Sequence, residues 1–232
     1  MKPPIRIGII DSGINPNHPH VGNIVGGITV TQDGPDEIYL DHIGHGTAVA
    51  GLIHLKAPDA HLVAVRVFER KLATTINTVL SAIDWCVNNR IDVINLSLGT
   101  TNPAHKHLFE AAIRRASAAN SIIVSAAEMG EEPGLPGSLP GVIGVLADSA
   151  LVEDQFAIAD YRGKRVFVAP PYPRPIPGVP RERNLQGISF AVAHITGWIG
   201  RLWPEYPGPR DWEETLAAYH EVQFQSSVDQ AS

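Results

Sequence analysis

Short runs of β-branched and apolar residues alternate along this chain with segments of helical periodicity, and this alternation limits the possible folds. The runs show little polar alternation, which is typical of strands buried on both faces of a parallel sheet. They are Ile5–Ile10, Leu62–Val67, Val93–Leu98, Ile122–Ser125, Val142–Leu146 and Val166–Val168. Strands that alternate with helices predict an α/β fold, with a three-layer, doubly wound, mostly parallel sheet and helices on both faces.

The expected helices are marked by apolar residues that recur on one helix face. This spacing predicts helices at Ile76–Val87, Leu108–Ala119 and Phe190–Leu202, with Asn120 as a stop signal after the second. The last of them needs the preceding sheet to bury its apolar face. We therefore predict a single domain.

The predicted domain covers residues 1–223, and a polar tail at 224–232 is expected to fray. Within the domain, Pro170–Pro180 is too rich in proline for regular structure. We expect an irregular connection there and not a linker between domains.

Composition bounds the partners and the compartment. The chain is 44% hydrophobic and 18% charged, with a net charge of −6 and scattered basic residues, so we expect neither nucleic acid nor a membrane as partner. A single cysteine, Cys86, excludes an internal disulfide, and a buried, inert thiol is its favoured interpretation. The chain starts without an apolar leader, from which we expect a cytoplasmic protein.

Three polar residues stand where α/β sheets gather catalytic groups. Asp11 ends the first expected strand, whereas His45 and Ser189 each stand at the entry to an apolar helical stretch. A serine hydroxyl becomes a nucleophile when an imidazole accepts its proton and a carboxylate orients that imidazole. Taken singly, such residues are more often turn residues and helix N-caps.

The flanking residues decide between these interpretations. The segments IIDSGI, HGTAVAG and GISFAVAHITG, in the order Asp, His, Ser, closely resemble the three active-site blocks of the subtilisin-like serine peptidases. The resemblance runs from about Ile5 to Leu202 and implies that Ser189 is the nucleophile, His45 the general base and acid, and Asp11 the orienting carboxylate.

The same resemblance implies a peptide or protein substrate in extended conformation. The segment INLSLG resembles the family's substrate-binding strand, which places Ser97, Leu98 and Gly99 where the substrate backbone pairs. We therefore expect a serine endopeptidase that works through an acyl-enzyme, with an intracellular processing role and narrow specificity.

One segment departs from the family pattern. The family supplies an oxyanion-hole Asn from an Ala-Ala-Gly-Asn segment, which reads SAAEMG here. An ungapped match puts Met129 on the Asn position, and a one-residue gap puts Glu128 there. Met cannot donate a hydrogen bond, whereas Glu donates only when protonated, which burial would favour. The alternative is that Glu128 points into solvent beside Glu131 and Glu132.

This departure leaves two other functions open. One is a catalytically impaired peptide-binding pseudopeptidase, and the other is an esterase that uses the same triad. No metal or other cofactor is expected. The calcium-binding loop of secreted relatives is missing from the short link Gly51–Ala60, and the histidines at 18, 20, 42 and 45 do not suggest the three or four convergent ligands that zinc needs.

Overall fold

The central feature of the structure is a twisted, mostly parallel sheet. The structure is a computed structural model that describes residues 3–31, 34–36, 38–206 and 211–225. In these residues the large sheet has nine strands in the order β10-β11-β9-β6-β5-β1-β4-β2-β3. Its strands are β1 (Arg6–Asp11), β2 (Ile24–Thr31), β3 (Gly34–Asp36), β4 (His61–Arg66), β5 (Val93–Leu96), β6 (Ile122–Ala126), β9 (Ile143–Ala147), β10 (Ala157–Tyr161) and β11 (Lys164–Ala169).

The pairing confirms the predicted fold class. From β11 to β2 every neighbouring pair is parallel, and the outermost pairs β2–β3 and β10–β11 are antiparallel. A separate two-stranded sheet joins β7 (Glu128–Met129) to β8 (Glu132–Pro133).

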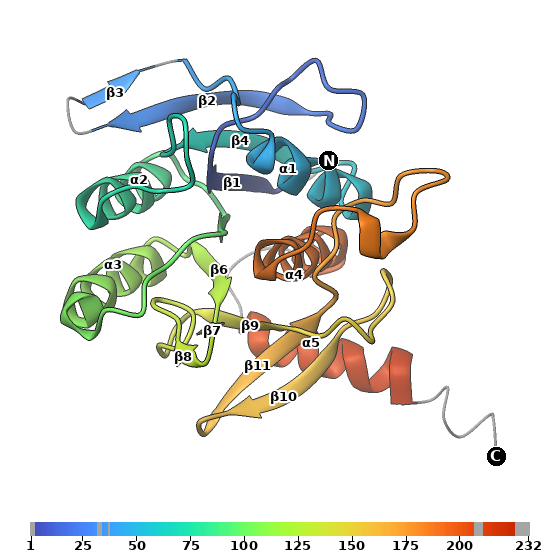
Figure 1. The fold of residues 1–232 in the computed structure, drawn as a ribbon. Coiled ribbons are helices and arrows are strands. Elements are labelled where there is room, and N and C mark those ends of the chain that lie inside the picture. The colour runs from blue at the N-terminus through green and yellow to red at the C-terminus, as the bar shows by residue number, and fades with distance from the viewer. Residues whose placement is uncertain (1–2, 32–33, 37, 207–210, 226–232) are drawn as a thin grey trace.

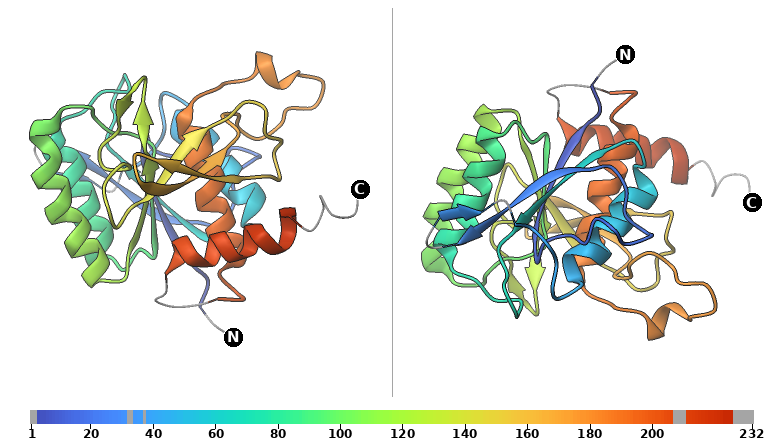
Figure 2. Two further views of the ribbon diagram at one scale, coloured as in Figure 1. Left: turned by 90° about the horizontal axis from the view of Figure 1, so that it is seen from below. Right: turned by 90° about the horizontal axis from the view of Figure 1, so that it is seen from above.

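Helices cover both faces of the large sheet, as Figures 1 and 2 show. One face carries α2 (Ile76–Asn88) and α3 (Lys106–Ala118). The other carries α1 (His45–Lys56) and α4 (Ile188–Leu202), with α5 (Trp212–His220) near the β10–β11 edge. Single turns complete the described chain at η1 (Pro103–His105), η2 (Arg181–Arg183) and η3 (Glu221–Gln225).

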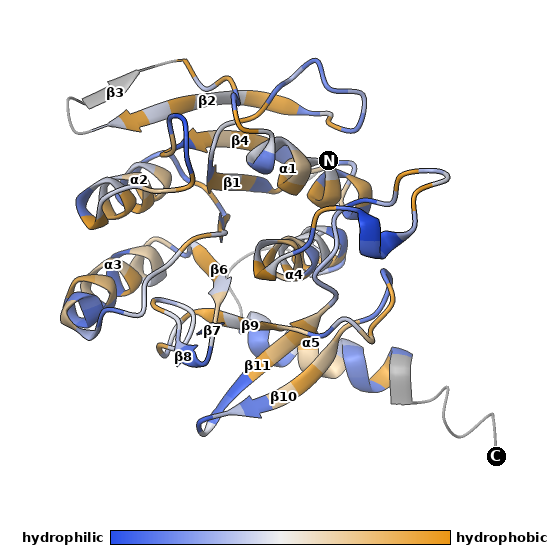
Figure 3. Ribbon diagram, viewed as in Figure 1, coloured by the Kyte–Doolittle hydropathy of each residue, from blue (hydrophilic) through white to orange (hydrophobic). Residues whose placement is uncertain are grey.

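Two hydrophobic cores hold the three layers together. One lies between the sheet and α1, α4 and α5, and includes Leu52, Val192 and Leu216. The other lies between the sheet and α2 and α3, and includes Ile83 and Phe109. Apolar residues accordingly concentrate in the central strands in Figure 3, whereas the η2 turn is polar. None of the helices in the described ranges is both long and apolar enough to cross a bilayer.

The six predicted strands and three predicted helices all form, with shifted ends. β5 ends at Leu96, so Ser97 and Leu98 lie beyond the strand. Asn120 follows α3 with a φ of 59°, consistent with the predicted stop. Pro170–Pro180 has no helix or strand, as expected. Of the tail predicted at 224–232, residues 226–232 lie outside the described residues, and the preceding two belong to η3.

Candidate active site

The site begins at the carboxyl ends of two adjacent parallel strands. β1 pairs with β5, so Asp11 at the end of β1 and Ser97 just after β5 lie at the same edge of the sheet. Carboxyl ends of parallel strands are where open α/β sheets place functional groups. Asp11 is fully buried, with 0% of its surface exposed.

Glycine allows α1 to approach β1 closely enough for His45 to reach Asp11. A Cβ on Gly46 would lie 2.2 Å from the carbonyl oxygen of Gly13 and 3.2 Å from Asp11 Cβ, so a side chain there would push the helix away. The backbone N–H of Gly46 donates to Ser12 Oγ at 2.9 Å, which fixes the approach.

Asp41 secures the start of the same helix. Its Oδ1 accepts hydrogen bonds from the N–H groups of Ile43 and Gly44, both at 2.8 Å. Its Oδ2 accepts from the N–H of Thr47 at 2.9 Å and from Thr47 Oγ1 at 2.6 Å. Burial alone would raise the pKa of Asp41, but these bonds lower it below its usual value. A carboxylate here satisfies backbone donors that a helix N-terminus leaves unpaired.

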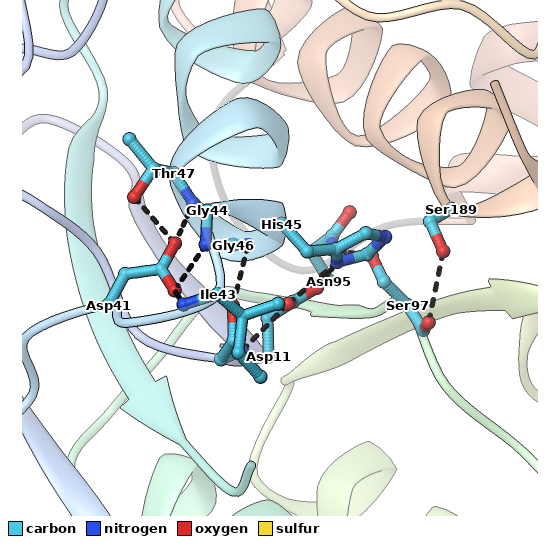
Figure 4. Close-up of polar contacts among 11 residues, drawn as sticks. Asp11, Asp41, Ile43, Gly44, His45, Gly46, Thr47, Asn95, Ser97 and Ser189 are labelled. Carbon is cyan, nitrogen blue, oxygen red and sulfur yellow. Dashed lines mark hydrogen bonds and ion pairs between the residues drawn. The ribbon is translucent and has the colours of Figure 1, made fainter. Parts of the chain in front are cut away.

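Asp11 and His45 form a close pair, drawn in Figure 4. His45 Nδ1 lies 2.7 Å from Asp11 Oδ1 and 2.9 Å from Oδ2, and the N–H of Ser12 also donates to Oδ1 at 2.7 Å. Burial opposes the charged imidazolium, yet the hydrogen bond and charge of Asp11, helped by the charge of Asp41, raise the pKa of His45 above its usual value. The carboxylate holds the imidazole with Nδ1 protonated, which leaves Nε2 as the acceptor.

Ser189 stands in the first turn of α4 and lines the same cavity as His45. Its hydroxyl donates to the carbonyl oxygen of Ser97 at 3.2 Å. Its backbone N–H belongs to the first turn of the helix, where the helix itself supplies no acceptor. The ring of Phe190, the next residue, packs against the His45 imidazole at 5.7 Å between centroids.

A buried polar chain, which was not predicted from the sequence, supports this corner. Thr196 Oγ1 on α4 donates to Asn95 Oδ1 at 2.9 Å, and Asn95 Nδ2 donates to Ser97 Oγ at 2.7 Å. Asn95 and Thr196 are both 0% exposed. The sequence feature that could have indicated it is Asn95 inside the apolar run Val93–Leu98, because a buried amide requires hydrogen-bond partners.

The predicted substrate-binding residues line a cavity of about 360 Å³ with His45 and Ser189. Ser97, Leu98 and Gly99 line it together with polar residues such as Thr74, Thr75 and His105. The apolar part of the lining includes Phe68, Leu72, Ile76, Val79 and Phe109. Thr100 is already paired with Leu135, at 3.1 and 2.9 Å. Leu98 and Gly99 make no backbone hydrogen bond to another described residue.

The two candidates for the oxyanion position differ in placement. Met129 lines the cavity with His45 and Ser189, and packs so closely on Gly99 that a Cβ there would lie 3.1 Å from its sulfur. Glu128 is half-buried in β7 and does not line this cavity. A thioether offers no donor to a developing oxyanion.

The remaining candidates lie apart from this centre. Cys86 is a free, buried thiol whose pKa is raised by burial, as the inert interpretation requires. His42 is exposed. Within the described ranges no three His, Cys, Asp or Glu side chains cluster in a way that could hold a metal ion. The absence of a metal or other cofactor stays a prediction.

An α/β sheet that gathers an Asp–His pair and a helix-start serine at one edge has the layout of a serine hydrolase. Comparison with known proteins identifies the family. The chain belongs to the subtilase family, whose family model matches residues 3–226. The predicted family is therefore confirmed.

Individual relatives agree with this assignment. A thermostable alkaline protease of Halalkalibacterium halodurans is 31% identical over 224 residues, 87% of this chain and 57% of that protein. Subtilisin E of Bacillus subtilis is 29% identical over 247 residues, covering 93% of this chain and 61% of its own length. For subtilisin DY of Bacillus licheniformis the identity is 29% over 223 residues, 88% of this chain and 78% of that protein. The chain thus spans less than two thirds of the length of the first two.

Proposed function

We propose that this protein is a serine endopeptidase that cleaves peptide bonds through an acyl-enzyme on Ser189. The observation that carries the proposal is the bond of 2.7 Å between buried Asp11 and His45, on a cavity that Ser189 shares with His45. Membership of the subtilase family supports the same chemistry.

Each group has a defined step in the proposed reaction. Ser189 Oγ turns from the Ser97 carbonyl to His45 Nε2, loses its proton to it and attacks the substrate carbonyl carbon. The C–N bond then breaks, His45 returns the proton to the departing amine, and an ester to Ser189 remains. Water attacks this ester with His45 again as the base, which releases the acid and restores the serine hydroxyl. Asp11 stays ionised and stabilises the imidazolium in both halves.

Oxyanion stabilisation is the weak point of this site. The backbone N–H of Ser189, in the first turn of α4, would donate to the oxyanion, but Met129 lines the cavity and stands where the ungapped family match expects an amide. One missing donor costs about 10²–10³ in turnover. Activated esters need less of this stabilisation than amides, so this observation favours esterase action as the second candidate function. A protonated Glu128 would remedy the lack only by moving toward the cavity.

The cavity suggests which substrates fit. The unpaired backbone of Leu98 and Gly99 would pair with an extended peptide, and the apolar wall around Phe68, Val79 and Phe109 would take an apolar side chain on the acyl side. Apolar walls with a few polar groups are typical of pockets that bind by shape.

A cytoplasmic processing role of narrow specificity is the further part of the proposal. It is supported by the single cysteine. A chain with one cysteine forms no internal disulfide and therefore does not depend on an oxidising compartment. A related protein of Bacillus subtilis, 32% identical over 179 residues, is named a minor extracellular protease, so the compartment must be measured. Fractionation of the native host, with an antibody to the chain, would locate it.

The activity is tested with matched peptide amides and esters that carry Phe or Asp on the acyl side. We expect cleavage after Phe, a larger rate for the ester than for the amide, and loss of both in Ser189→Ala. Ester hydrolysis without any amide cleavage would instead favour the esterase. Binding of the peptides without cleavage of either bond would favour the pseudopeptidase.

A further inference from the structure

A second cavity lies beside the active site, on the other flank of the α1 N-terminus. Its volume is about 330 Å³, and it shares no lining residue with the cavity that holds His45 and Ser189. Its walls come from the residues on either side of His45, from the loop after β1, and from the irregular segment that precedes Ser189. Figure 4 shows Asp41 and Thr47, which line it, on the opposite side of His45 from Ser97 and Ser189.

Arg174 supplies the positive charge of this cavity. It is half-buried, and its guanidinium has no hydrogen bond or ion pair to any described residue. Its backbone is held, because Asn184 Nδ2 donates to the Arg174 carbonyl at 3.2 Å. A partly buried guanidinium without a carboxylate partner is unusual, since its planar fork of donors favours bidentate binding of an anion.

The acidic residue that lines the cavity is already engaged. Both carboxylate oxygens of Asp41 accept hydrogen bonds from Ile43, Gly44 and Thr47 at the start of α1. Glu153 lies near enough to Arg174 to be influenced by its charge, yet the two make no ion pair. Neither carboxylate forms an ion pair with Arg174, which lines the cavity.

Two histidines add polar ring nitrogens to the cavity wall. His18 Nδ1 accepts from the N–H of His20 at 3.3 Å, so the neutral His18 ring carries its proton on Nε2. The two rings lie edge to face at 5.0 Å, and both residues line the cavity. Burial, followed by the positive charge of Arg174, lowers the pKa of His20 below its usual value.

Part of the remaining lining is apolar and would fit a short aliphatic stem, beside the polar side chains of Asn15, Thr47 and Asn184. Ala48, Pro173, Ile176 and Leu185 contribute carbon surface to the cavity that Arg174 also lines. A carboxylate on a short stem would place its charge on Arg174 and its methylene groups on these residues.

Position assigns this cavity to the leaving side of the scissile bond. Under the proposed function, the acyl part of the substrate lies along Ser97–Gly99, and the scissile bond lies between His45 and Ser189. The part of the substrate beyond that bond would then pass the α1 N-terminus, where Arg174 lies. We propose that Arg174 selects substrates with an Asp or Glu side chain shortly after the scissile bond; this inference rests on the proposed function.

Matched peptides test it. Each carries Phe before the scissile bond and Asp, Asn or Lys at one of the next two positions, with the C-terminus either free or amidated. We expect the wild-type chain to prefer Asp to Asn by about tenfold or more in kcat/KM, in line with charge-assisted hydrogen bonds. Arg174→Gln should reduce the ratio to about one, and Arg174→Glu should favour Lys. Arg114→Gln, an exposed residue of α3, should keep the wild-type ratio.

The outcomes separate this inference from the function on which it rests. Wild-type cleavage with no preference between Asp and Asn would overturn the role of Arg174 and leave the peptidase standing. A preference that disappears when the C-terminus is amidated would also overturn it, because the cavity would then bind a chain end and not a side chain. A folded chain that hydrolyses neither peptide nor a small-leaving-group ester would overturn both.

Discussion

At the scale of single residues, the electrostatics of His45 give the sharpest prediction. The pKa of His45 is raised in the folded chain, so activity that needs the neutral imidazole should fall as the pH drops through that raised value. Asp11→Asn removes the charge and favours the wrong tautomer. We expect a loss of about 10⁴ in kcat and an acid limb displaced to lower pH, read from a pH–rate profile.

The same shift has a consequence for stability. The folded state holds the His45 proton more tightly than the unfolded state. The contribution of the Asp11–His45 pair to the free energy of unfolding is therefore complete below the unfolded pKa of about 6.5. It is lost as the pH rises through the raised folded value. The difference in Tm between wild type and Asp11→Asn should therefore narrow as the pH rises through this window. A difference that widens would contradict the assigned direction.

Replacement of Met129 by a hydrogen-bond donor should raise peptidase activity. Met129→Asn would place an amide donor on the cavity wall beside Ser189. Since a single oxyanion donor contributes about 10²–10³ in turnover, we expect amide hydrolysis to rise at least tenfold, and ester hydrolysis to rise less. Met129→Leu, of similar volume and without a donor, is the control and should leave the amide-to-ester ratio unchanged.

At the scale of elements, the packing of α4 against β1 and the end of α1 depends on small residues. A Cβ on Gly200 would lie 2.7 Å from Ala57 Cβ and 3.2 Å from Ile7 Cδ1. Gly to Ala normally stabilises a helix by about 1 kcal/mol, but overpacking here costs about 1–3 kcal/mol. We expect Gly200→Ala to lower the free energy of unfolding by about 1–2 kcal/mol in urea denaturation. The swap Ala57→Gly with Gly200→Ala should recover much of that loss.

Lys164 joins β11 to the turn that precedes β9. Its Nζ donates to the carbonyls of Gly137, Leu139 and Val142 at 2.8, 2.8 and 2.6 Å. Lys164→Met would leave these oxygens without the ammonium, and we expect a loss of about 2–3 kcal/mol in thermal or urea unfolding. Lys106→Met is the matched control, because that side chain is exposed and its pair with Glu110 spans 3.9 Å. Equal losses in both variants would refute the role of Lys164.

The burial of each helix or strand decides whether the sequence predicts it. Central strands such as β1 and β5 are apolar on both faces and read as continuous runs. β2 was missed, because Gly26 and Gly27 interrupt its apolar pattern and one of its edges pairs only with β3. β10 was missed because it is a half-buried edge strand. α5 lies close to the end of the chain and has a weak apolar face, with Leu216 as its main buried aliphatic residue.

At the scale of the whole molecule, the site combines segments that are far apart in the sequence. Asp11, His45 and Ser189 could be predicted as a triad from the sequence alone because their flanking residues are distinctive. The Thr196–Asn95–Ser97 chain and the Arg174 cavity could not, since they depend on which strand ends and loops meet in space. The proline-rich segment that carries Arg174 has no periodicity from which its position could be read.

The assembled sheet edge should activate Ser189 as a nucleophile. This activation is tested most directly by reacting the folded chain with a fluorophosphonate and locating the adduct by mass spectrometry. We predict one adduct, on Ser189, that disappears in both Ser189→Ala and His45→Ala while circular dichroism shows all three proteins folded. A folded wild-type chain that stays unlabelled, or that is labelled at another residue, would contradict the account.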